Sequence, residues 1–128
     1  MTSFKLKIAV LFSTLCLLTS TLSFAHVGSS GVLFQGQAGS YRVLVSLQPP
    51  DVIPGTAQVT VYVENGNVQT VMARPIYFRT GDEGAPSADP LTPVANQTGQ
   101  FQGIVWLMAG GATSVQITLD GDSGKSEI

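Results

Sequence analysis

The sequence contains a single cysteine, Cys16, and a single histidine, His26, among its 128 residues. Zinc sites built from thiolates or from several imidazoles, CxxC redox motifs and internal disulfides are therefore excluded. Charged side chains are also scarce, at 11% of the chain, whereas 44% of the residues are hydrophobic. This composition is too apolar for a disordered chain, and the length favours a single domain.

Long apolar runs are confined to the N-terminus. Lys5 and Lys7 precede an apolar run over residues 8–22, which ends near the small-x-small pattern Ser23-Phe24-Ala25. The run is short for a transmembrane helix, which needs about 20 apolar residues. We therefore predict a secretory signal over residues 1–25, with an uncleaved membrane anchor as the alternative. The chain is expected to be exported to the periplasm or the cell exterior, or to stay tethered to the membrane if the segment is not cleaved.

Positive charge is sparse beyond the predicted signal. Residues 26–128 carry four basic side chains, which are scattered, against eight acidic ones, for a net charge of −4. Contacts to nucleic-acid phosphates need clustered lysine and arginine, so a nucleic-acid partner is not expected. The 103 residues are enough to bury a hydrophobic core without disulfides.

Apolar and polar side chains alternate along several stretches of residues 26–128, which is the pattern of half-buried strands. No stretch shows helical spacing, and all 14 glycines and 7 prolines lie after Ala25, mostly clustered as turn signals between the apolar stretches. We predict an all-β domain, an immunoglobulin-like two-sheet β-sandwich of six or seven strands. The expected strands cover residues 31–37, 41–48, 57–64, 68–73, 75–80, 99–108 and 113–120.

Turns and one long loop are expected between these strands. Asn65-Gly66 and Asp120-Gly121 are typical of tight hairpin turns, because these residues tolerate positive φ. Residues 81–98 show no strand pattern, which favours a mobile surface loop over a binding loop.

The stretch over residues 101–108 is apolar on both faces. Phe101, Val105 and Leu107 form one face, and the opposite face carries Ile104, Trp106 and Met108. Either a loop covers the second face, or these three side chains form an exposed patch. In the second case the patch would bind a partner protein or a membrane-tethered, membrane-proximal domain.

His26 is the one candidate metal ligand. Cleavage after Ala25 would leave His26 with a free α-amine and an imidazole, two nitrogen donors that can chelate copper, although a tight site needs further ligands. Asp82, Glu83 and Asp89 lack a recognised calcium spacing. A Ser-His-acid triad would have to place His26 at a frayed terminus, so we predict no catalytic residues and no enzyme activity.

Several of these features together resemble a known group of domains. They are His26 after the signal, Pro54-Gly55 before Val59-x-Val61-x-Val63, the turn at Asn65-Gly66, and Gly99-Gln100-Phe101 leading to Trp106. Over residues 26–121 this pattern resembles the YtkA-like and FixH-like group, exported or membrane-tethered bacterial immunoglobulin-like domains related in architecture to the CopC-type copper carriers. The resemblance implies the fold and the location. In the CopC-type carriers a second histidine joins the N-terminal one, and here only His26 matches.

The last expected strand looks short, since only residues 125–128 remain to form it beyond the Asp120-Gly121 turn region. Either the chain is part of a longer protein, or an open sheet edge is left for another strand to complete. The leading hypothesis is a non-enzymatic exported binding or assembly module, with the extracytoplasmic part of a longer membrane protein as one form of it. The alternative is a copper-handling protein that uses His26.

Overall fold

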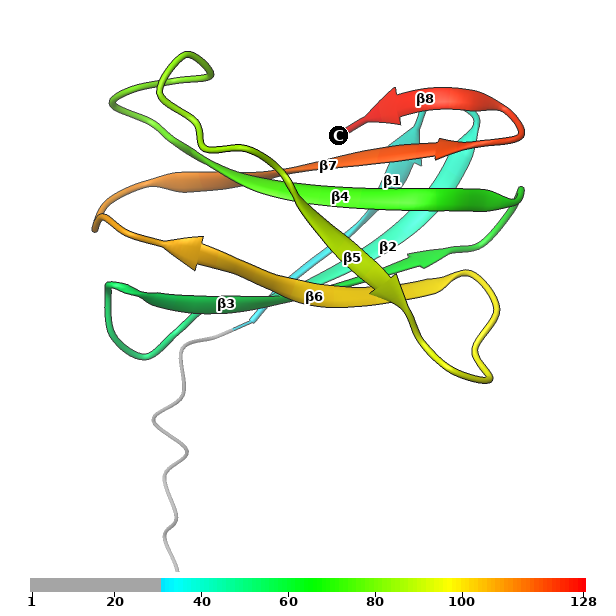
Figure 1. Ribbon diagram of the computed structural model, residues 1–128, viewed down its shortest axis with the longest axis horizontal. Helices are drawn as coiled ribbons and strands as arrows, with labels where there is room; N and C mark the ends of the chain where they lie inside the picture. Colours follow the sequence, from blue (N-terminus) through cyan, green and yellow to red (C-terminus); the bar gives the residue numbers. More distant parts are fainter. Residues whose placement is uncertain (1–30) are drawn as a thin grey trace, which may run out of the picture.

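The computed structural model describes residues 31–128, and every regular element in this part of the chain is a β-strand (Figure 1). The strands are β1 (Val32–Ala38), β2 (Tyr41–Gln48), β3 (Gly55–Val63), β4 (Val68–Tyr77), β5 (Asp89–Pro93), β6 (Gln100–Leu107), β7 (Thr113–Gly121) and β8 (Gly124–Glu127). The all-β prediction is confirmed. The expected number of six or seven strands is wrong, because residues 31–128 contain eight.

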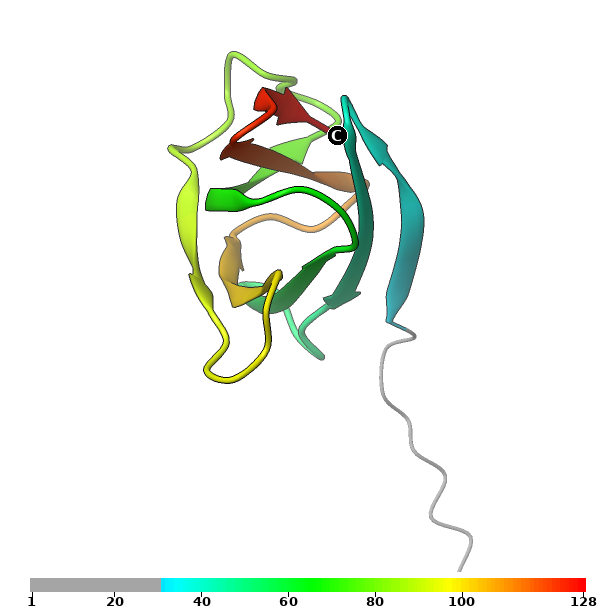
Figure 2. The same ribbon diagram turned by 90° about the vertical axis from the view of Figure 1, so that its right-hand side faces the viewer.

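All neighbouring strands are antiparallel, and they form a nearly closed sheet in the order β1-β2-β3-β6-β5-β4-β7-β8. β5 joins the two halves, because Thr92 and Pro93 pair with β6 whereas residues 89–91 pair with β4. The first and last strands of this order, β1 and β8, have no strand partner on their outer edges within residues 31–128. Figure 2, at right angles to Figure 1, shows the strands arranged around a common interior.

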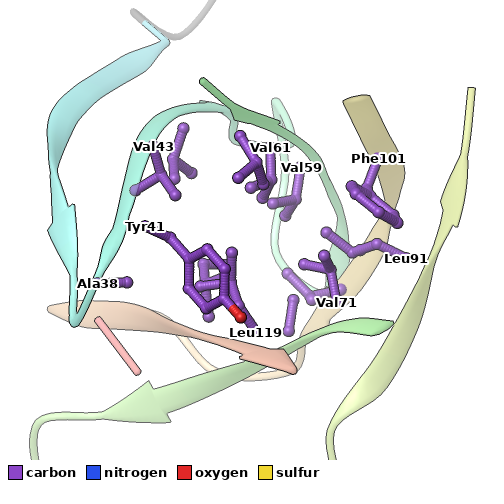
Figure 3. Close-up of a cluster of buried hydrophobic side chains, with 14 of the residues drawn as sticks. Ala38, Tyr41, Val43, Val59, Val61, Val71, Leu91, Phe101 and Leu119 are labelled. Carbon is purple, nitrogen blue, oxygen red and sulfur yellow. The ribbon is translucent and has the colours of Figure 1, made fainter. Parts of the chain in front are cut away.

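The core fills this interior (Figure 3). On β2 and β3, every second residue is buried, as the alternating sequence predicts. Tyr41, Val59, Val71 and Leu119 reach the core from four different strands and are fully buried. Burial of each such aliphatic side chain stabilises the fold by about 1.5–3 kcal/mol.

The two strands expected over residues 68–73 and 75–80 form one strand, β4, so that prediction is wrong. In an antiparallel ladder, residue pairs that exchange backbone hydrogen bonds alternate with pairs that do not. In the β4–β7 ladder Arg74 belongs to a hydrogen-bonded pair, so its backbone N–H and C=O groups face β7. The nitrogen of Pro75 therefore points to the other side of β4, where β5 pairs only as far as Ala73. Because no strand lies there to accept a hydrogen bond, proline is tolerated inside β4.

The segment expected to be a mobile loop contains β5. Its five residues include two prolines and one buried apolar side chain, Leu91, so strand alternation is barely visible in the sequence. The preceding loop is also anchored, because the Arg74 guanidinium donates a hydrogen bond to the Asp82 carboxylate. Residues 81–98 are therefore not a long strandless segment.

The Asn65-Gly66 turn is not a hairpin, because it connects β3 to β4, which do not pair. Asn65 instead holds the β1–β2 turn: its side-chain amide donates to the backbone oxygen of Ser40 at 2.9 Å, and its Oδ1 accepts from the backbone N–H of Arg42. The β1–β2 hairpin turns at Gly39-Ser40, where Gly39 has a φ of 57°. The β7–β8 turn lies at residues 122–123, two positions after the predicted one.

Candidate functional site

The clearest recess in residues 31–128 lies where the sheet fails to close. We call the space between the β1–β2 hairpin and the β7–β8 hairpin the seam, and the pocket of about 570 Å³ within it the seam groove. None of its lining residues carries an ionisable side chain, and most are apolar. They are Val32, Phe34, Val45, Leu47, Pro49, Ile53, Leu107, Gly111, Thr113, Ser114, Val115, Ile117 and Ile128.

One wall of the seam groove is β1, an edge strand. Val32 and Phe34 stand on the same face of β1 as the buried Ala38, so their side chains are directed inward. Phe34 nevertheless remains 46% exposed. The ring of Phe34 lies over Gly36, since a Cβ added to that glycine would come within 2.6 Å of it. An inward aromatic side chain that stays half exposed indicates that the interior is incompletely covered here.

The other wall is the first half of β7, which extends beyond β8. The β7–β8 ladder ends at Ile117 and Ile128, whose backbones exchange two hydrogen bonds of 2.9 and 3.0 Å. Backbone groups of every second residue face the same side of a strand, so those of Val115 and Thr113 face the same side as those of Ile117. Within residues 31–128, no strand lies beside Val115 and Thr113 on that side.

The opposite half of the seam is held shut by side chains. The Tyr41 hydroxyl accepts a hydrogen bond of 2.9 Å from the backbone N–H of Ser123 and donates one of 3.1 Å to the backbone oxygen of Gly124. Gly39 lies so close to β8 that an added Cβ would be 2.3 Å from Oγ of Ser126. The seam is therefore closed at the hairpin turns and open toward the start of β7.

Ile104, Trp106 and Met108 form a separate surface. They lie on the outer face of β6 and are 49%, 55% and 64% exposed, so the interpretation that a loop covers them is wrong. Leu107, between Trp106 and Met108, points the other way and lines the seam groove. The structure thus places the predicted patch and the groove on opposite faces of β6, and partner binding by the patch stays a prediction.

The patch is narrow. Across the ladder, Trp106 is opposite Thr56 and Ile104 is opposite Gln58, and these neighbours are polar. Met108 is fixed at one end of the patch, because its backbone N–H donates a hydrogen bond of 2.7 Å to the Tyr77 hydroxyl.

The candidate metal ligand His26 and the predicted signal over residues 1–25 lie outside the described residues. Within residues 31–128, no three histidine, cysteine, aspartate or glutamate side chains are grouped as a metal site would require, and this includes Asp82, Glu83 and Asp89. The same part of the chain has no helix that could cross a bilayer. Copper binding by His26 stays a prediction.

Sequence analysis did not identify the seam groove. The groove joins residues from β1, β2, β6 and β7, far apart in the sequence, and its lining residues show the same apolar alternation as ordinary core positions. The only signal was the short stretch after the predicted Asp120-Gly121 turn, which indicated an open sheet edge.

Comparison with known proteins gives no assignment: no family model, no curated protein and no solved structure matches this chain.

Proposed function

We propose that this protein is a non-enzymatic exported binding or assembly module, and that the seam groove binds an apolar part of its partner. The observation that carries the proposal is the groove itself, a pocket of about 570 Å³ lined mainly by apolar side chains. Its volume lies within the range of about 300–1,000 Å³ that is usual for ligand sites. Because no ionisable side chain lines it, the hydroxyls of Thr113 and Ser114 have no side-chain acid or base among the lining residues, and the groove favours apolar surface.

We further propose that the domain is an immunoglobulin-like sandwich of the YtkA-like and FixH-like type. In seven-stranded immunoglobulin-like domains the first, second, fifth and fourth strands form one sheet, and the third, sixth and seventh form the other. If β2 is counted as the first strand, the order observed here, β2-β3-β6-β5 followed by β4-β7-β8, is the same as in those domains. β1 would then be an additional edge strand. This strand order supports the immunoglobulin-like arrangement, whereas the YtkA-like and FixH-like type is supported by the sequence resemblance alone.

Copper handling through His26 is the alternative proposal. Its support is the predicted cleavage after Ala25, which would give His26 two nitrogen donors on one residue. The seam groove supplies no side-chain ligand to such a site, because none of its lining residues is a histidine, cysteine, methionine, aspartate or glutamate. The two proposals therefore rest on different parts of the chain.

The binding proposal is tested with a neutral apolar dye, Nile red, added to the folded protein. We expect its fluorescence to rise on binding in the groove, and Phe34→Ser to weaken this binding about fivefold, corresponding to about 1 kcal/mol of lost apolar contact. Phe78→Ser is the matched control, because Phe78 is 85% exposed and does not line the groove. We expect that variant to bind the dye like the wild type.

Circular dichroism melting of both variants would verify that they are folded under the conditions of the dye titration. Equal dye binding by the wild type and both variants, or an equal loss in both variants, would show that the groove is not the apolar binding site.

A further inference from the structure

We infer that the occupant of the seam groove is an extended strand of a partner polypeptide, which adds to β7 beside Val115 and Thr113. This inference rests on the proposed function and specifies the chemistry of the partner. It follows from the backbone groups that border the seam. The apolar character of the groove alone would not distinguish a site for a strand from a site for a small hydrophobic molecule.

The first step is the hydrogen-bonding pattern of β7. Because the Ile117–Ile128 pair exchanges two backbone bonds, the next positions with backbone groups on that edge are Val115 and Thr113. Both residues are only half buried. Burying them under an apolar molecule would leave their N–H and C=O groups without hydrogen-bond partners, which is unfavourable. An incoming strand would pair with all four groups as well as fill the groove.

The second step concerns the opposite wall. The two-residue turn at Gly39-Ser40 makes Ala38 and Tyr41 a hydrogen-bonded pair, so the backbone groups of Phe34 face β2. The backbone groups of Leu33 and Gln35 then face away from β2, on the free edge of β1. A strand lying in the seam thus meets, on both sides, backbone groups with which no strand of residues 31–128 pairs, as in β-strand addition.

The third step concerns the side chains of the partner strand. Residues paired with Val115 and Thr113 must direct their side chains inward, toward Phe34 and Leu47, whereas the alternate residues face solvent. An inward charge would be buried with no opposite charge among the lining residues. The partner segment is therefore extended, with small or branched apolar residues at every second position and polar residues between them.

A second copy of residues 31–128 does not supply such a strand. A strand in the seam needs two free edges, one toward β7 and one toward β1, whereas each strand of a folded second copy already has at least one edge paired. Using one of them would require the donor fold to open. We therefore assign the strand to a different polypeptide.

The test uses a synthetic peptide as the probe, acetyl-Lys-Thr-Val-Thr-Val-Thr-Val-Thr-Lys-amide, titrated into isotope-labelled protein. The control peptide has the same side chains, but an ester oxygen replaces the backbone N–H of each valine. These N–H groups are the ones that would donate hydrogen bonds to β7. We expect the amide peptide to bind in the seam and to slow hydrogen exchange of the Val115 and Thr113 amides. The ester peptide should bind about tenfold more weakly, because about two hydrogen bonds are lost.

Equal affinity of the two peptides would overturn strand addition while leaving apolar binding in the groove intact. Strand addition would also be overturned if the peptide did not bind, or if it bound without changing the exchange of the Val115 and Thr113 amides. The Nile red titration tests the proposed function separately. Sedimentation analysis adds one further outcome. A dimer of the free protein with protected seam amides would show that the occupant is a second copy, which contradicts the assignment to a different polypeptide.

Discussion

Replacing Leu119 with alanine is expected to lower the free energy of unfolding by about 2–5 kcal/mol, the range for deleting a buried leucine side chain. Leu119 is fully buried, pairs across the ladder with Val71 and belongs to the same buried cluster as Tyr41 (Figure 3). The substitution leaves a cavity where the two halves of the nearly closed sheet meet. Urea denaturation followed by circular dichroism measures the loss.

Ile104→Ala is the control for this experiment. Ile104 is also an apolar strand residue, but it lies on the outer face of β6 with half of its surface exposed, so its truncation is expected to cost less than about 1 kcal/mol. If the two variants lost the same stability, the assignment of inner and outer faces would be wrong.

Tyr41→Phe is expected to have the second largest effect, a loss of about 1–3 kcal/mol. The ring of phenylalanine fills the same space, but the backbone N–H of Ser123 and the oxygen of Gly124 lose their partner. Because this hydroxyl ties β2 to the β7–β8 turn, the loss should be accompanied by faster hydrogen exchange at the β8 amides. Urea denaturation and amide exchange by nuclear magnetic resonance measure the two effects.

Tyr62→Phe provides the matched control, since Tyr62 lies on the outer face of β3 and is 42% exposed. We expect a change within about 0.5 kcal/mol and no change at β8. An equally small effect of Tyr41→Phe would contradict the role of its hydroxyl in closing the seam.

The fold could be predicted where each strand carries its own signal. The alternation over residues 41–48 and 57–64 predicts β2 and most of β3, because these strands bury one face against the core. β4 and β5 were not predicted correctly, because proline is tolerated wherever the neighbouring strand is missing or the position lies at an edge. Whether Pro75 breaks a strand depends on where β5 pairs, and this is a property of the tertiary structure.

The two candidate sites also differ in how far the sequence alone could predict them. The exposed patch with Trp106 was predicted as one of two alternatives, because the sequence shows that both faces of the strand are apolar but not whether a loop covers the outer one. The seam groove could not be predicted, because the alternation of apolar and polar residues shows which residues share a face of a strand but not which strands lie side by side. Val32 and Val115 line the same pocket because the fold places β1 and β7 on either side of the seam.

Hydrogen exchange of the backbone amides in the free protein tests the central claim, that the seam is open beside the first half of β7. Leu119 and Val115 both face inward and direct their backbone groups to the same edge, but only Leu119 is paired with β8. We predict slow exchange at Leu119 and exchange near the unprotected rate at Val115. Protection of Val115 equal to that of Leu119 in the free monomer would mean that the seam is already closed, and would contradict both the groove and its proposed partner.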